Sequence, residues 1–162
     1  QPHGVCTDSE GRVYVSDNSN DRIQVFDSQG KFLRKWGGRG SGDGEFSRPQ
    51  GVAIDVDGNV YVADRENHRI QVFDLDGNPI RQSNYAGLPC GLIVSGDDLY
   101  MVSGHSGQIV KIDEDGHVVA ATGESGEGIG RFGEAHYLAI GPMNEIFVAD
   151  PVTGEVEKFV PR

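Results

Sequence analysis

The sequence VADRENHRIQVFD fills residues 62–74, and a shorter copy, NDRIQVFD, fills residues 20–27. Weaker copies are QIVKID at 108–113 and EVEKF at 155–159. Each copy is short, and its β-branched or aromatic residues roughly alternate with polar ones, which is typical of a β-strand. A segment that returns this often indicates a protein built from internal repeats.

Three other landmarks recur around this segment. Each repeat opens with a strand start, namely QPHGV at 1–5, RPQGV at 48–52, LPCGL at 88–92 and EAHYL at 134–138. A second strand follows: YVSD at 14–17, YVAD at 61–64, MVSG at 101–104 and FVAD at 147–150. A further strand is clear in KFLRKWG at 31–37 and weaker in PIRQS at 79–83 and HVVAATG at 117–123. Asp/Gly turns such as DVDGN separate the strands.

This pattern predicts an all-β fold, a β-propeller of four-stranded blades. The central residues of the strand starts are 47, 40 and 46 positions apart, which matches the length of a propeller blade. No stretch shows a sustained helical period, and an immunoglobulin-like sandwich, the alternative, would not repeat its own sequence. We expect one propeller domain over 1–162, with repeats at approximately 1–41, 42–83, 84–127 and 128–162.

The last repeat ends after its third strand and is expected to leave an exposed sheet edge. We favour the interpretation that the chain is part of a longer five- or six-bladed propeller. The alternative is closure of the ring by a partner or by self-association with a second copy.

Composition narrows the range of partners. The chain has 25 acidic and 14 basic residues, a formal net charge of −11, and its Lys and Arg are scattered over all four repeats. A nucleic-acid binder needs a concentrated basic face, so we expect no nucleic acid as partner. No apolar run approaches the roughly 20 residues of a membrane helix, so we expect no membrane insertion. Cys6 and Cys90 are too few for a disulfide scaffold.

The run at residues 62–74 is similar to the consensus of NHL repeats, and this similarity extends over the whole chain. A narrower resemblance links GDGEFSRPQGVAID, VYVADRENHRIQVF and the final EAHYLAI, EIFVAD and VEKFVPR to the last blades of the peptidyl-α-hydroxyglycine α-amidating lyases. That resemblance implies a six-bladed propeller that cleaves a hydroxyglycine peptide into an amide and glyoxylate. It further implies zinc held by three histidines from alternate blades, an active-site arginine and tyrosine, and export from the cytoplasm, although the sequence itself leaves the compartment unknown.

The match with the lyases is partial. His136 takes the place of the last zinc histidine, and Arg65 takes that of the active-site arginine, where it would bind the substrate carboxylate. Gln50 replaces the middle zinc histidine, and SDNSND at 16–21 lacks the tyrosine. His3 lies in a blade where these enzymes typically have threonine, so the resemblance does not make it a ligand.

The repeat alone places His3, Gln50, Cys90 and His136 at equivalent strand starts, and these line the channel of a propeller. His3, Cys90 and His136 could bind zinc or copper with an open fourth position. The alternative is that all four line the channel or bind a ligand without metal, with Cys90 acting as a small buried apolar residue.

Other recurring polar residues have structural interpretations. Asp17, Asp64 and Asp150 return at the same place in three blades, which favours turn contacts, and Arg22 and Arg69 are expected to pair with a carboxylate between blades. GGRGSGDGEF at 37–46 precedes a strand and is interpreted as a connector between blades.

Two functions remain open. The first is a non-catalytic NHL-repeat propeller that binds a peptide or protein across its channel face. The second is a metal-dependent, amidating-lyase-like enzyme with an altered zinc site, in which Arg65 holds the substrate and a metal near His136 acts as Lewis acid. The fold alone decides neither.

Overall fold

A computed structural model describes residues 1–160 of the chain. The structure is all-β, as the sequence predicts, and contacts group it into two compact units, residues 1–86 and 87–162. Within residues 1–160, no helix is long and apolar enough to cross a membrane.

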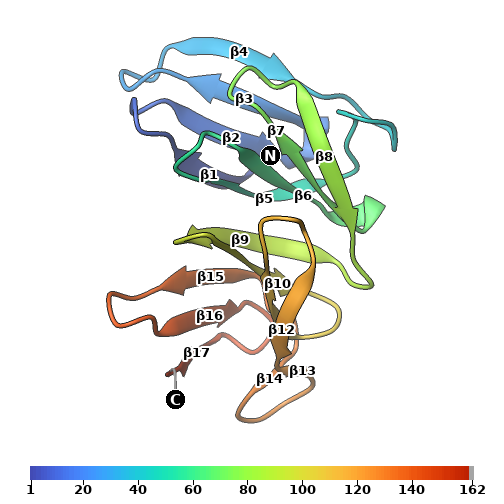
Figure 1. The fold of residues 1–162 in the computed structure, drawn as a ribbon. Coiled ribbons are helices and arrows are strands. Elements are labelled where there is room, and N and C mark those ends of the chain that lie inside the picture. Colours follow the sequence, from blue (N-terminus) through green and yellow to red (C-terminus); the bar gives the residue numbers. More distant parts are fainter. Residues whose placement is uncertain (161–162) are drawn as a thin grey trace. The chain divides into compact units, whose positions relative to one another are not determined.

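The first unit contains two four-stranded antiparallel sheets whose strands follow one another in chain order (Figure 1). The first sheet comprises β1 (Pro2–Thr7), β2 (Val13–Asp17), β3 (Arg22–Phe26) and β4 (Phe32–Trp36). The second comprises β5 (Pro49–Ile54), β6 (Val60–Asp64), β7 (Arg69–Phe73) and β8 (Pro79–Asn84). Short 3₁₀ turns, η1 (Asn18–Asn20) and η2 (Arg65–Asn67), join the second strand of each sheet to the third.

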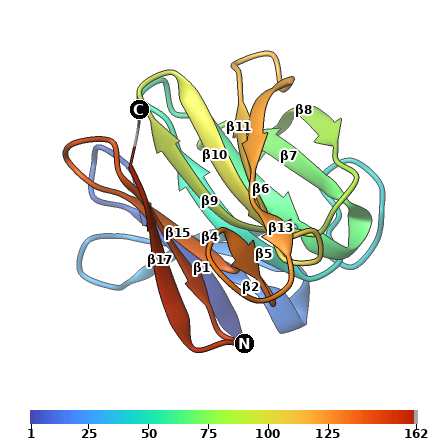
Figure 2. The same ribbon diagram turned by 90° about the horizontal axis from the view of Figure 1, so that it is seen from below.

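The second unit continues the same meander, coloured yellow to red in Figure 2. Its first sheet comprises β9 (Pro89–Ser95), β10 (Asp98–Ser103), β11 (Gln108–Ile112) and β12 (Val118–Thr122). Its second sheet has three strands, β15 (Tyr137–Ile140), β16 (Ile146–Asp150) and β17 (Glu155–Phe159). The fifteen blade strands predicted from the repeat are therefore all present, and the last sheet lacks a fourth strand among the described residues.

The Asp/Gly turns fold as hairpins for a local reason. In the turn between β5 and β6, the Asp55 carboxylate accepts the backbone N–H groups of Asp57 and Asn59 at 3.0 and 2.8 Å. Gly58 sits at φ +85°, a left-handed conformation that glycine adopts without steric cost. The same Asp-x-x-Gly arrangement recurs at Asp8, so the turn chemistry fixes the register of both hairpins.

Two connectors share one structure. Strands β13 (Glu124–Ser125) and β14 (Arg131–Phe132) pair in parallel, and the bridge between Arg39 and Phe46 repeats that pairing in the first unit. Each connector ends on a buried phenylalanine that packs against the third strand of the blade that follows. Phe46 lies 5.6 Å from Phe73, and Phe132 lies 6.0 Å from Phe159, measured between ring centroids. This confirms residues 37–46 as a connector between blades.

The register of the third blade corrects the alignment made from sequence. In the first two blades, Pro2 pairs with Asp17 and Pro49 with Asp64, but Pro89 pairs with Ser103 and not with Gly104. Ser103 therefore holds the aspartate position of the third blade. Gly104 is therefore the counterpart of Asn18 and Arg65, one residue earlier than the alignment of MVSG with YVSD and YVAD implied.

Each unit has its own apolar core. In residues 1–86 the core is Tyr14, Ile23, Val25, Phe46, Val52, Val60, Val62 and Phe73. In residues 87–160 it is Cys90, Val102, Ile109, Phe132, Ala135 and Val148. Trp36 of β4 packs between Tyr14 and Phe73 at centroid distances of 6.2 and 5.8 Å, so it joins the first blade to the second.

Candidate functional site

The strand starts named by the sequence share an irregular backbone. Between Pro2 and Val5, two residues of β1 face one residue of β2, and the same bulge occurs between Pro49 and Val52 and between Pro89 and Leu92. A β-bulge redirects a side chain that the regular pleat would point elsewhere. His3, Gln50 and Cys90 each occupy the first position of this bulge.

Close approach of neighbouring inner strands brings the predicted residues together in pairs. A Cβ atom on Gly4 would come within 2.4 Å of the Gln50 carbonyl oxygen, and a Cβ on Gly91 within 2.8 Å of the His136 carbonyl oxygen. β1 therefore lies against β5, and β9 lies against β15. The strands are so close at these two positions that only glycine fits. The structure therefore brings His3 beside Gln50 in the first unit, and Cys90 beside His136 in the second.

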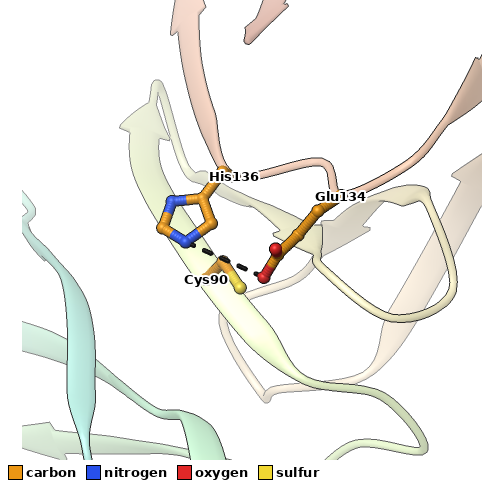
Figure 3. A group of neighbouring side chains, drawn as sticks. All are labelled: Cys90, Glu134 and His136. Carbon is orange, nitrogen blue, oxygen red and sulfur yellow. Dashed lines mark ion pairs between the residues drawn. The ribbon is translucent and has the colours of Figure 1, made fainter. Parts of the chain in front are cut away.

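Cys90 and His136 gather a third residue that the sequence did not single out. The Cys90 thiol, the Glu134 carboxylate and the His136 imidazole each place one ligand atom within 4.8 Å of the others. Figure 3 shows Cys90 on β9 and the other two side chains on the segment that leads into β15. Glu134 Oε1 lies 3.9 Å from His136 Nε2. His3, the remaining residue of the predicted metal set, belongs to the other unit.

The spacing Glu-x-His at 134–136 was the available sequence signal for Glu134. In a regular strand, residues two apart point to the same face, so the strand start predicted at 134–138 would place Glu134 on the side of His136. The structure begins β15 only at Tyr137, so Glu134 and His136 lie in the segment before the strand. The resemblance to the lyases named His136 and not Glu134.

The recurring aspartates bind within their own blades. Asp64 is fully buried and accepts hydrogen bonds from Arg69 Nε at 2.7 Å and Gln71 Nε2 at 3.1 Å. Asp17 accepts the corresponding bond from Arg22 Nε at 2.8 Å. The expectation that these arginines pair with carboxylates between blades was therefore wrong, because each partner lies five residues earlier in the same blade. Contacts of Arg69 beyond its own blade go to backbone carbonyls of the connector, at Ser41, Gly42 and Glu45.

Arg65 lies at the start of η2 and engages its neighbour. Its guanidinium donates a hydrogen bond to the Glu66 carboxylate, and its side chain is largely buried. The structure thus shows Arg65 in an ion pair with the next residue of η2.

A polar depression of about 390 Å³ lies in the first unit, beside the start of β5. It is lined by polar side chains of the β2–β3 turn and of the connector, among them Asn18, Ser19, Asp21, Arg39, Ser47 and Arg48. Arg39 and Arg48 are exposed, and within residues 1–160 neither guanidinium forms an ion pair. The sequence did not indicate this site, because the other repeats carry no arginine at the positions of Arg39 and Arg48.

Arg48 adopts a strained backbone conformation. Its φ is +54°, and the residue that follows is Pro49, which disfavours helical conformations for the residue before it. The Asp21 carboxylate accepts the Arg48 backbone N–H at 2.8 Å, and Asp21 itself sits at φ +50°. Asp21 and Arg48 thus both have left-handed backbones and share a hydrogen bond at the rim of the depression. Backbone strain of this kind is often retained at functional sites.

Short segments of the chain match repeat proteins of animals. The similarity is 50% identity over 44 residues with RING finger protein nhl-1 of Caenorhabditis elegans, and 51% over 35 residues with Protein lin-41 of the same organism. It is 56% over 36 residues with human NHL repeat-containing protein 3. These matches cover 22–27% of this chain and only 3–10% of the relatives.

Solved structures match the whole chain at low identity. A streptogramin B lyase structure has a TM-score of 0.75 and 14% identity over 97% of this chain and 50% of its own. A protein of unknown function from Bacteroides caccae has a TM-score of 0.78 at 13% identity, over 99% of this chain and 63% of its own. Glutaminyl cyclase of Myxococcus xanthus has a TM-score of 0.72 at 15% identity, over 99% and 66%. At these identities the likeness concerns the fold.

A family model described as a 6-bladed beta-propeller matches residues 2–107, which is more than half of the chain. The four repeats, their antiparallel meanders of three or four strands and the NHL-type relatives agree with that match. The chain therefore belongs to the 6-bladed beta-propeller family, and segments of it are similar to NHL-repeat proteins.

Proposed function

We propose that the chain is a peptide- or protein-binding propeller that recognises an acidic segment of its partner in the polar depression of residues 1–86. The observation that carries this proposal is the pair of arginines, Arg39 and Arg48, exposed at the rim without carboxylate partners among the described residues. A guanidinium is a planar fork that binds a carboxylate through two hydrogen bonds. In a chain of net charge −11, two such unpaired groups on one depression favour an acidic ligand.

The scaffold supports this assignment. The repeated polar residues, such as Asp64 and Arg69, bond to other groups within the protein. They therefore stabilise the blade and do not face a ligand. The depression is lined instead by residues that differ between repeats. Variable positions on a rigid scaffold are where repeat proteins place their binding specificity.

A direct test uses two labelled peptide pools. The first contains random hexapeptides rich in Asp and Glu, and the second replaces these residues by Asn and Gln. Fluorescence anisotropy should show the acidic pool binding more tightly than the neutral pool. Arg39→Gln and Arg48→Asn should each weaken acidic binding by roughly tenfold or more, since a hydrogen bond to a charged group contributes about 1.5–3 kcal/mol. Asn tolerates the left-handed backbone at position 48.

Lys31→Gln is the matched control, because it removes one positive charge from an exposed turn away from the depression. Its affinity should equal that of the unaltered chain. Equal binding of the acidic and neutral pools, or no binding of either, would reject the proposal.

A metal-dependent lyase is the alternative function, and the nearness of His136 to Cys90 and Glu134 supports it. Arg65 weakens it, because the guanidinium that should hold the substrate carboxylate already pairs with Glu66. Release of glyoxylate from a hydroxyglycine peptide by the chain supplied with zinc would favour this alternative over a purely binding role.

A further inference from the structure

The cluster of Cys90, Glu134 and His136 combines a thiol, a carboxylate and an imidazole from two neighbouring blades of one unit. We propose that these three side chains bind one zinc ion. Zinc accepts all three ligand types, and three protein ligands leave a fourth position for water. This proposal depends on neither peptide binding nor lyase activity, because a zinc ion can occupy the site without either.

The ligand atoms are close to the spacing that zinc requires. Bonds of about 2.3 Å to sulfur and about 2.0–2.2 Å to nitrogen or oxygen, in tetrahedral geometry, place ligand atoms about 3.4–3.6 Å apart. Glu134 Oε1 and His136 Nε2 are 3.9 Å apart, and all three atoms lie within 4.8 Å of one another. Small rotations of the side chains are therefore enough to bring the three ligand atoms to the separations that zinc requires.

Gly104 makes room for the cluster. A Cβ atom at this position would lie 2.9 Å from Cys90 Sγ and 3.2 Å from Glu134 Cγ and Oε1. The counterparts of Gly104 in the first two blades are Asn18 and Arg65, whose side chains would fill the space. The third blade thus departs from the repeat at the point where the cluster needs an opening.

The backbone holds the ligands in place. The Asp150 carboxylate accepts the backbone N–H groups of Gly133 at 2.6 Å and Glu134 at 3.2 Å. The backbone N–H of His136 donates to the Ala149 carbonyl at 3.1 Å. Glu134 and His136 are therefore anchored to β16, while Cys90 is fixed on β9.

A thiolate at Cys90 needs a cation beside it. Cys90 is 1% exposed and lies among apolar residues, so a thiolate there would be costly without a cation beside it. On binding, the thiol releases its proton to solvent and its hydrogen bond to the Leu88 carbonyl. That carbonyl keeps a second partner, because it accepts the Gly104 backbone N–H at 3.0 Å.

The test is a metal titration of the whole chain after treatment with a chelator. We expect one equivalent of zinc in a competition assay with a chromogenic chelator. We also expect cobalt(II), which occupies zinc sites, to give the near-ultraviolet absorption of a thiolate–cobalt bond. Cys90→Ala should abolish that absorption, and Glu134→Gln and His136→Ala should each lower zinc affinity by roughly 100-fold, since even outer-shell changes cost about 10–100-fold.

Two controls make the test specific. Cys6→Ala removes the other thiol, which lies in the first unit, and should leave zinc binding and the cobalt spectrum unchanged. Gly104→Ala keeps every ligand but presses on Cys90 and should lower the affinity at least tenfold. A wild-type chain that binds no zinc, a cobalt complex without the thiolate band, or binding that persists in both Cys90→Ala and His136→Ala would overturn the proposal. The wild-type spectrum decides the matter even if a variant fails to fold.

Discussion

Asp64 has no exposed surface, and it accepts hydrogen bonds from three side chains and one backbone N–H group. Its counterpart Asp150 is also buried, but the hydrogen bonds that it accepts come from backbone N–H groups. The recurring aspartate therefore has a different structural role in the second blade than in the fourth. In the second blade it neutralises the buried Arg69, and in the fourth it fixes the entry into β15.

This difference leads to a prediction about stability. Asp64→Asn leaves the guanidinium of Arg69, which is 4% exposed, without its carboxylate, and should lower the free energy of unfolding by about 3–5 kcal/mol. Asp150→Asn keeps one acceptor oxygen and should cost about 1–3 kcal/mol. Urea unfolding measures both, and exposed Asp57→Asn should be neutral. A smaller loss for Asp64→Asn than for Asp150→Asn would contradict this interpretation.

Acid should weaken the fold by protonating the carboxylates of Asp8 and Asp150. Burial alone would raise the pKa of Asp8, but hydrogen bonds from Arg12 outweigh it and hold that pKa below the ordinary value of 3.8. Burial would likewise raise the pKa of Asp150, but hydrogen bonds from the backbone N–H groups of Thr153 and Val152 lower it. Because the folded pKa values lie below the unfolded ones, this stabilisation is complete above about pH 4 and disappears as pH falls through the folded values.

We therefore expect the urea midpoint to fall as the pH is lowered below about 4. Asp150→Asn should make that fall shallower, since one of the responsible groups no longer titrates. Stability that rises on acidification would show that the assigned pKa directions are wrong.

The residue scale also shows what the sequence could not predict. The aspartate turns, three of the four strand starts and the equivalence of Cys90 and His136 followed from the repeat, because tandem blades place the same position in the same part of the fold. Glu134 and the strained Arg48 did not, since neither has a matching residue at its repeat positions. Arg48 takes its left-handed conformation from a contact with Asp21, twenty-seven residues earlier, and no local pattern signals such a contact.

At the scale of elements, the two connectors carry an anchoring phenylalanine each. Phe46→Ala should lower the free energy of unfolding by about 3–5 kcal/mol, the usual cost of emptying a buried phenylalanine site. Phe32→Ala is the matched control, because Phe32 lies on β4 with 48% of its surface exposed and should cost far less. Equal losses from the two variants in urea unfolding would mean that the connector does not anchor the blade.

The third blade lacks the aspartate–arginine pair of the first two blades. Ser103 and Gln108 stand opposite each other where the first two blades have an aspartate and an arginine. The Ser103 hydroxyl is buried and has no hydrogen-bond partner within residues 1–160. Ser103→Asp alone should destabilise the chain, because it buries an unpaired charge. Adding Gln108→Arg should recover stability, with a coupling energy of about 0.5–3 kcal/mol in a double-mutant cycle.

A coupling of zero in that cycle would show that the third blade has lost the geometry of the pair as well as its residues.

The third blade was also misaligned by one residue in the sequence analysis. MVSG at 101–104 resembles YVSD more closely than YMVS at 100–103 does, so similarity placed the repeat one residue too late. Hydrogen-bond register, which follows the bulge at Cys90, sets the true correspondence.

At the scale of the whole molecule, the repeat predicted the fold class because each blade encodes the same four strands. The chain covers about half to two thirds of the solved structures that it resembles, so the activity of a complete ring is a matter of proposal. Its acidic composition bears on the partner. With a net charge of −11, acidic ligands are repelled at long range and must be captured by a local arrangement of arginines.

The most direct test of that claim is to map where an acidic peptide binds. A photo-crosslinkable acidic hexapeptide is irradiated with the whole chain, and the adducts are located by mass spectrometry. Binding in the depression predicts adducts within residues 18–21 and 39–48, which disappear in Arg39→Gln and Arg48→Asn and are not formed by the neutral peptide. Adducts concentrated on the outer strands β4 and β8, or equal labelling by the neutral peptide, would contradict the assignment of this site.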